Sequence, residues 1–327
     1  MKKLLLTIFI IIFTASFTKA DDKDSYIKLK SIKSLSDIHS IECDLCGCYL
    51  GVEPKFGNNS VGFRYSYFRF HSDPVIVPVD VPVPEHETDP KGETEIFSKI
   101  ELVAKFNLNT KLRLFLTIPY KLNDINGKYI SDFGDVSILG QYLVYSTEMS
   151  FKNETRYRHR FYIGGGLSIP TGAFNNQLIY GITEPHFQTG TGAFSFLVNG
   201  SYYSKFREFG LSLDAAYSTS LANKSKYRFA DRLNLAANLS YEFGINEIGL
   251  LPHAGLYYES AGFDNQKDLE VDDSGGKVLF ITGGIDSYFS HFSFNINYEY
   301  PLSQNLNGTQ TENKFRVITG LTYFFGM

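Results

Sequence analysis

Residues 291–300 read HFSFNINYEY, and this stretch decides the fold because its side chains change polarity at every position. The apolar set comprises Phe292, Phe294, Ile296, Tyr298 and Tyr300. The polar set comprises His291, Ser293, Asn295, Asn297 and Glu299. Successive side chains of a β-strand point to opposite faces, so the stretch predicts a strand with one apolar and one polar face.

The same alternation recurs along the chain and predicts about twelve strands, each long enough for a tilted strand to cross a membrane. With the stretch above, the expected strands are residues 60–70, 96–107, 111–120, 134–146, 156–169, 190–205, 208–219, 229–243, 248–260, 277–289, 291–300 and 314–325.

Composition points in the same direction. The 327 residues include 29 Phe, 22 Tyr and 28 Gly but no Trp, and mean hydropathy is only slightly negative. A barrel strand gives a weak hydropathy signal because every second residue is polar, so this value does not exclude a membrane protein. We therefore predict an all-β, transmembrane, antiparallel up-and-down β-barrel whose outer face contacts outer-membrane lipid.

The connections between the expected strands sort by length. Long segments follow the first strand and every second strand after it, whereas the intervening connections are tight. The segment 147–155 fits this rule least well, since it is longer than a tight turn. Outer-membrane barrels carry long loops at one end and short turns at the other. A soluble β-sandwich would also alternate, but nothing in a sandwich sorts its loops by parity.

The first residues form a targeting segment. Lys2 and Lys3 precede an apolar run, and Thr18-Lys19-Ala20 supplies small residues for a cleavage site. We expect a signal peptide at 1–20, a short periplasmic N-terminal segment at 21–59 and the barrel at 60–327. An uncleaved anchor is the alternative, although the run is short for a membrane helix. The expected location is the bacterial outer membrane, with the chain as a monomer.

Cys43, Cys46 and Cys48 are the only cysteines and lie within six residues of one another in the periplasmic segment. Exported thiols meet an oxidising compartment, so two of them could form a disulfide. Alternatively, three thiolates could bind a soft ion such as copper or zinc, although a fourth ligand is missing from the spacing. Both interpretations stay open, and no other cofactor is expected.

Charged side chains share the polar phase of the expected strands and are candidates for the lumen wall. They could form an ion-paired, water-facing wall that keeps the barrel rigid, or a selectivity surface in a pore. The first role is the commoner one. These candidates are Arg64, Lys99, Glu101, Lys105, Lys111, Arg113, Asp214, Arg232, Glu242, Glu299 and Arg316.

Several stretches resemble the outer-membrane transporter family named after the meta-pathway of phenol degradation. They are DFGDVSILGQYLVY at 132–145, GGGLSIPTGAF at 164–174, GIDSYFSHFSFNINYEYPLSQNLNGTQ at 284–310 and FRVITGLTYFF at 315–325. The resemblance implies a barrel related to channels for hydrophobic compounds. Residues 42–70 resemble a Cys-rich N-terminal subgroup, which is loosely associated with metal handling. The last two residues, Gly326-Met327, depart from the common aromatic C-terminus.

No nucleophile elbow, phosphate-binding glycine loop or helical pair of metal-binding histidines is readable, so we expect no enzyme. The near-neutral charge and the lack of a basic stripe argue against nucleic-acid binding. The predicted function is a porin-like channel or transporter for a small solute, which could be a hydrophobic or aromatic compound. The alternative is a scaffold that binds metal or a periplasmic partner through the cysteine segment.

Overall fold

The computed structural model describes residues 58–71, 94–125, 127–147, 157–176, 184–245 and 248–325. The expected signal peptide, nearly all of the periplasmic segment and the three cysteines lie outside these residues, so those expectations stay predictions. The strands are β1 (Asn59–His71), β2 (Thr94–Asn107), β3 (Leu112–Ile125), β4 (Lys128–Phe133), β5 (Val136–Ser146), β6 (Tyr157–Ile169), β7 (Ser195–Phe206), β8 (Phe209–Ser220), β9 (Tyr227–Arg228), β10 (Arg232–Tyr241), β11 (Phe243–Ile245), β12 (Ile248–Ala261), β13 (Asn265–Gln266), β14 (Leu269–Glu270), β15 (Gly276–Phe289), β16 (Phe292–Leu306) and β17 (Glu312–Phe325).

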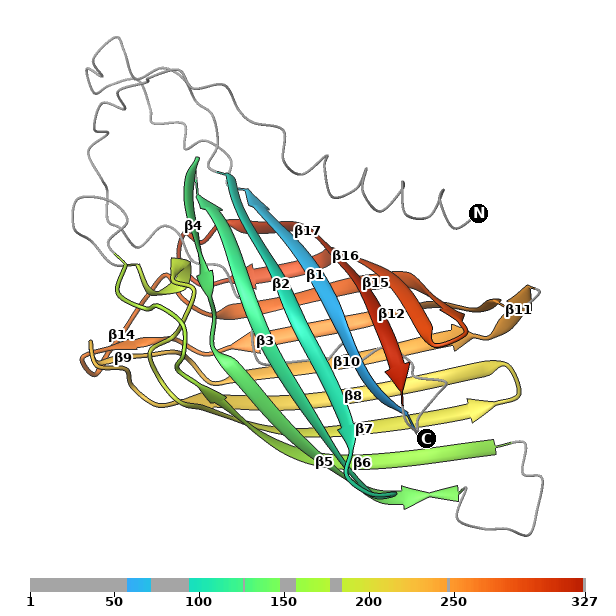
Figure 1. Cartoon of the computed structure of the whole chain (residues 1–327). Coiled ribbons are helices and arrows are strands. Elements are labelled where there is room, and N and C mark those ends of the chain that lie inside the picture. The colour runs from blue at the N-terminus through green and yellow to red at the C-terminus, as the bar shows by residue number, and fades with distance from the viewer. Residues whose placement is uncertain are drawn as a thin grey trace, which may run out of the picture. The chain divides into compact units, whose positions relative to one another are not determined.

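Within the described residues, twelve long strands form one closed antiparallel barrel, which confirms the predicted fold class (Figure 1). Each long strand pairs with the next one along the chain. The first and last close the ring, because β1 pairs with β17 from Asn59↔Phe325 to His71↔Glu312. Closure satisfies the backbone groups of every strand and leaves no open edge, as a membrane-embedded sheet requires. No helix in the described part of the chain is long and apolar enough to span a membrane.

Side chains alternate between the outer and inner faces of the wall. On β10 the outward Leu233, Leu235 and Leu239 are exposed, whereas the intervening Asn234 and Asn238 are buried. In a soluble sheet the large apolar side chains would be the buried ones. Polar residues inside and apolar residues outside therefore indicate that hydrocarbon surrounds the barrel.

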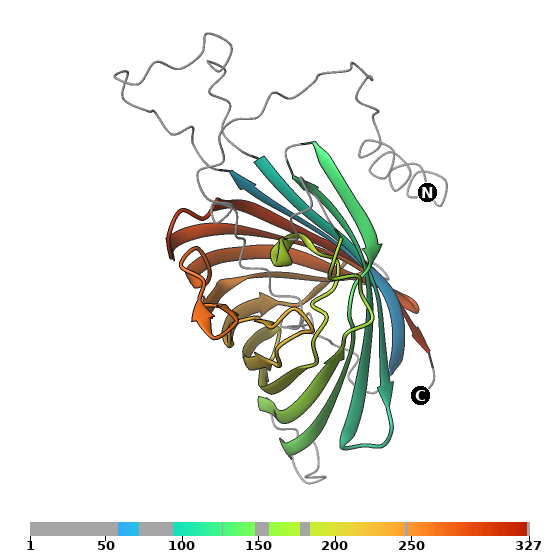
Figure 2. The ribbon, with the colours of Figure 1, turned by 90° about the vertical axis from the view of Figure 1, so that its left-hand side faces the viewer.

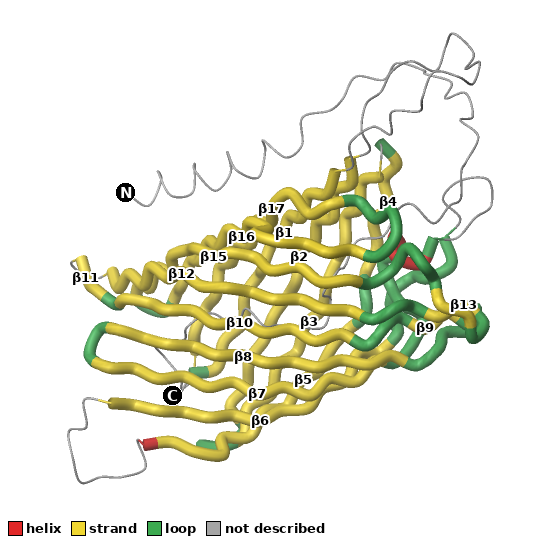
Figure 3. The backbone as a smooth tube through the Cα atoms, turned by 180° about the vertical axis from the view of Figure 1, so that it is seen from behind, coloured by secondary structure: helices red, strands yellow, loops and turns green. Residues whose placement is uncertain are grey.

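The connections sort by length as the sequence predicts. Short turns at 207–208 and 290–291 lie at the end where the barrel's two terminal strands begin and finish. Long connections, with the small sheet β9–β13–β14, lie at the opposite end (Figure 3). Outer-membrane barrels place long loops outside the cell and short turns in the periplasm. The segment 148–156 lies outside the described residues.

Three stretches differ from the expected boundaries. The segment 121–133, expected to be a loop, instead extends β3 and returns as β4, with Lys121 paired to Asp132. A turn at Gly127 (φ +82°) joins them. Residues 190–194, expected in a strand, are loop because Gly190 packs directly on the Gly172 backbone, where a Cβ would lie 2.4 Å from a carbonyl carbon. β16 also runs past Tyr300 to Leu306.

Candidate functional site

An ion pair crosses the lumen between strands that are not neighbours in the wall. The Arg316 guanidinium on β17 donates to both carboxylate oxygens of Glu259 on β12, each at 2.9 Å. Strands β16 and β15 lie between β17 and β12 in the sheet, so this ion pair spans the interior of the barrel. Arg316 also donates a hydrogen bond to Asn313 Oδ1 at 2.9 Å and lies 3.8 Å from Glu299.

Aromatic rings hold the same guanidinium from the sides. Its carbon lies 4.2 Å from the ring centroid of Phe280 and 4.9 Å from that of Phe68, both within range of a cation–π interaction. The side chains of Arg316 and Glu259 are only 3% and 1% exposed. A charge this deeply buried needs its partner, because an unpaired ion in low dielectric is costly.

A second charged group lies on the neighbouring strands β1 and β2. Arg64 Nε donates to Glu101 Oε2 at 2.6 Å, and Lys99 Nζ lies 3.5 Å from Glu101 Oε1. Between this group and the Arg316–Glu259 pair is a cavity of about 50 Å³, with room for a few water molecules. Charged and aromatic side chains therefore border a space of only a few waters at this level of the lumen.

A third charged group lies against aromatic rings further round the wall. The guanidinium carbon of Arg113 on β3 is 3.7 Å from the Tyr162 ring centroid, and its Nε donates to Gln141 Oε1 at 2.7 Å. A neighbouring cavity of about 30 Å³ is lined by Arg64, Phe115, Ser137 and Leu197, among others.

The structure distributes the sequence candidates as follows. Lys99, Glu101, Lys105, Arg113, Glu299 and Arg316 are all at most 6% exposed and alternate with lipid-facing residues. Arg64, Asp214 and Arg232 are half-buried on the same phase, and Glu242 pairs with Lys205 near the short-turn end. Lys111 lies in the turn before β3 with its side chain exposed, outside the buried set. Whether this wall selects solutes stays a prediction.

Sequence reasoning missed Glu259, which makes the closest contacts with Arg316. The consecutive aromatics Tyr257 and Tyr258 hide the phase of β12, because one faces inward and packs on Phe280 while the other faces outward. Counting by twos from the buried His253 does reach Glu259. That parity was therefore a usable signal.

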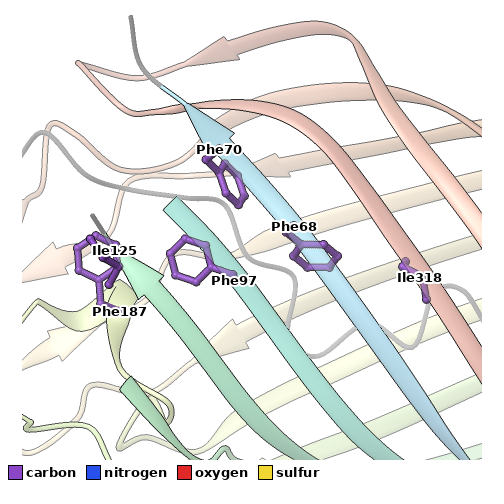
Figure 4. Close-up of a cluster of buried hydrophobic side chains, with 6 residues drawn as sticks. All are labelled: Phe68, Phe70, Phe97, Ile125, Phe187 and Ile318. Atoms are coloured by element: carbon purple, nitrogen blue, oxygen red, sulfur yellow. The ribbon is translucent and has the colours of Figure 1, made fainter. Parts of the chain in front are cut away.

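The loop between β6 and β7 folds into the long-loop mouth (Figure 2). A single 3-10 turn, η2 (Pro185–Phe187), carries the buried Phe187 ring to 5.9 Å from that of Phe97. Figure 4 shows Phe187 beside Ile125 and facing Phe97, in the apolar cluster that includes Phe68 and Phe70. Asn123 Nδ2 also donates to the Phe187 carbonyl at 3.2 Å. We call residues 184–189 the plug.

A buried carboxylate ties the plug to two other loops. Asp264 Oδ2 lies 2.5 Å from His186 Nε2 and accepts a hydrogen bond from the Tyr227 hydroxyl at 2.5 Å. Its Oδ1 accepts one from the Ala230 amide at 2.7 Å. Asp264 thus joins the plug, the β8–β10 connection and the β12–β15 connection at one point.

These contacts stabilise the ionised carboxylate. Burial alone would raise the pKa of Asp264, but the His186 imidazole and the Tyr227 hydroxyl together hold it well below its usual value. Burial first, and then the Asp264 charge, raise the pKa of Tyr227 far above its ordinary value. A carboxyl with a lowered pKa contributes its stability above the unfolded-state value and loses it only as pH falls through the folded value. Mild acid should therefore leave Asp264 ionised.

Replacing Asp264 by alanine is expected to release the plug. His186, Tyr227 and the Ala230 amide would lose their shared acceptor, at about 1–3 kcal/mol for each buried donor left unpaired. Limited proteolysis should then cut the β6–β7 loop much faster. Asp272→Ala, an exposed carboxylate in the same β12–β15 connection, is the matched control. Equal cleavage rates for the two variants would contradict the role of Asp264.

Among the described residues, no group of three His, Cys, Asp or Glu side chains is arranged to hold a metal ion. The metal site expected at Cys43, Cys46 and Cys48 lies outside those residues and stays a prediction.

A solved structure shares this architecture, and two others were matched at lower similarity. An outer membrane channel from Pseudomonas putida F1 matches with a TM-score of 0.59 and 13% sequence identity, over 84% of this chain and all 100% of that one. The β domain of the Bordetella autotransporter BrkA matches with a TM-score of 0.43 and 10% identity, over 82% and 99%. The transport unit of the autotransporter AIDA-I from Escherichia coli gives 0.40 and 12%, over 85% and 94%.

The match to the Pseudomonas channel agrees with the apolar outer face: the fold is that of an outer-membrane β-barrel. No protein-family model matches the sequence, and no curated protein matches it. The barrel part of the sequence resemblance is thus confirmed at the level of fold, and the Cys-rich subgroup stays a prediction.

Proposed function

We propose that this chain is a monomeric outer-membrane channel for small polar solutes, with the plug closing its long-loop mouth. The observation that carries the proposal is the inversion of the barrel: apolar side chains cover its outside, while Arg316, Glu259 and their charged neighbours line its inside. Buried ion pairs are often no more stabilising than apolar packing, so stability alone does not account for them. A charged lining suits a conduit for polar solutes.

The charged lining favours a polar solute over the hydrophobic or aromatic compound that the sequence resemblance implies. A hydrophobic solute would have to pass the charges of Glu101, Glu259 and Arg316, which offer it no favourable contact. The apolar cluster runs from Phe187 at the mouth to Phe68 beside Arg316, and an apolar constriction can gate by excluding water.

Reconstitution into planar lipid bilayers tests the proposal. We expect discrete current steps from the purified full-length chain, with long closed periods because the plug closes the long-loop mouth. A protein that inserts into the bilayer but never passes current under any voltage or salt would overturn it.

Phe187→Ala is expected to raise the open probability severalfold. The substitution removes the ring that packs on Phe97 and so takes away much of the apolar contact that holds the plug in the mouth. Phe263→Ala is the matched control, since this aromatic lies in a long-loop connection with its side chain 38% exposed. If both variants conduct like the wild type, the plug does not control the pore.

A further inference from the structure

Three side chains converge over a glycine in the lumen wall. Gly284 on β15 pairs with His253 on β12 and with Asn297 on β16, so all three positions face the lumen. A Cβ at Gly284 would lie 2.8 Å from His253 Nε2. The His253 imidazole therefore lies over Gly284 and occupies the space that a side chain at position 284 would take.

Asp286 lies two residues further along β15 and faces the same space. Its Oδ2 is 3.9 Å from His253 Nε2, which is too long for a hydrogen bond. The residue is only 2% exposed, and this oxygen has no hydrogen-bond partner. An unpartnered buried carboxylate oxygen is expensive, and a cation between it and the imidazole would compensate it.

Asn297 contributes a second oxygen of the same kind. Its Nδ2 donates to Glu299 Oε1 at 3.2 Å, which fixes the amide with Oδ1 turned away from Glu299. That oxygen is buried and has no partner. On β16, Asn297 lies between Glu299, which is paired with Thr282, and Asn295, which is paired with Asp286. An oxygen of Asn297 that points away from Glu299 therefore points toward Asp286.

We propose that His253, Asp286 and Asn297 bind one divalent first-row transition-metal ion, such as Ni²⁺ or Zn²⁺, in the barrel lumen. One imidazole nitrogen and two oxygens form a borderline donor set that suits these ions better than Cu(I), which prefers sulfur. Metal–ligand bonds of about 2 Å place two donors up to about 4 Å apart, so a small side-chain rotation brings Nε2 and Oδ2 onto one ion. Water completes the coordination. The site is independent of the cysteine segment and of solute passage.

Calorimetric titration with Ni²⁺ alone tests the site. The protein is the full chain in detergent, stripped with chelator and carrying Cys43→Ser, Cys46→Ser and Cys48→Ser to remove thiolate ligands. We expect one ion per chain. Asp286→Ala and His253→Ala should each weaken binding at least tenfold, because each removes one of three protein donors. His291→Ala, which removes an exposed histidine in the β15–β16 turn, should leave binding unchanged.

Two variants keep the test decisive if one of them fails to fold, and each must first show the mobility of a folded barrel on unheated gels. Wild-type affinity in both folded variants, or no stoichiometric binding in the thiol-free chain, would overturn the site. Because the titration measures no current, a barrel that does not conduct would refute the proposed channel and leave this site standing.

Discussion

Glu259→Ala is expected to destabilise the barrel by about 3–5 kcal/mol, the usual cost of removing one partner of a buried ion pair. The substitution leaves the Arg316 guanidinium without the two hydrogen bonds of 2.9 Å that Glu259 provides, at a site only 3% exposed. Glu299, at 3.8 Å, is too distant to replace both of them. Guanidinium titration of the protein refolded in lipid vesicles measures the change.

Two comparisons make this result specific. Glu312→Ala removes a partner of Lys314 whose side chains are 37% and 56% exposed, and should change stability by less than about 0.5 kcal/mol. The double substitution Glu259→Leu with Arg316→Met removes both charges together and should recover most of the loss. If Glu259→Ala were as mild as Glu312→Ala, the lumen around Arg316 would be wet rather than packed.

Leu235→Arg is expected to cost about 2–4 kcal/mol, as cations on the lipid face of a barrel do near the middle of the bilayer. Leu235 faces outward on β10 between the buried Asn234 and Ala236, and is 41% exposed. An exposed leucine in a soluble protein would tolerate arginine with little change. The same vesicle titration reports the difference.

Leu269→Arg is the matched control for the lipid face. Leu269 is 73% exposed on β14, in the small sheet at the long-loop end, where water rather than hydrocarbon surrounds it. This change should be nearly neutral. Equal effects at Leu235 and Leu269 would mean that both positions share one solvent, which the barrel does not allow.

The local alternation of polar and apolar residues was enough to predict most of the fold. The strand at residues 291–300 was readable because each side chain meets either hydrocarbon or the lumen, and the two environments select opposite residue types. The signal weakened where strands leave the membrane. Lys121 and Asp124 on β3 belong to a hairpin whose polar sequence resembles that of a loop, although Lys121 is buried inside the barrel. Gly190 lies outside its expected strand because a contact with Gly172, which is distant in sequence, determines its backbone conformation.

The candidate site was likewise predictable in part from the sequence. Parity predicted that Glu101, Arg113 and Arg316 lie on one phase, since that depends only on each residue's own strand. Parity could not predict which residues meet across the lumen, because the contact of Arg316 with Glu259 depends on barrel diameter and stagger. The plug was equally hidden, since Phe187 lies in a long connection that carries no periodic signal.

The most direct test of the account is quenching by bromine-labelled lipid along β10, with single fluorescent labels in the protein lacking its native cysteines. The account predicts strong quenching at the outward positions and weak quenching at the inward ones, with a period of two. The outward positions are Leu233, Leu235, Ala237 and Leu239, and the inward positions are Asn234, Ala236 and Asn238. Quenching that is uniform along the strand, or that comes only from a water-soluble quencher at the outward set, would contradict a barrel with its apolar face in lipid.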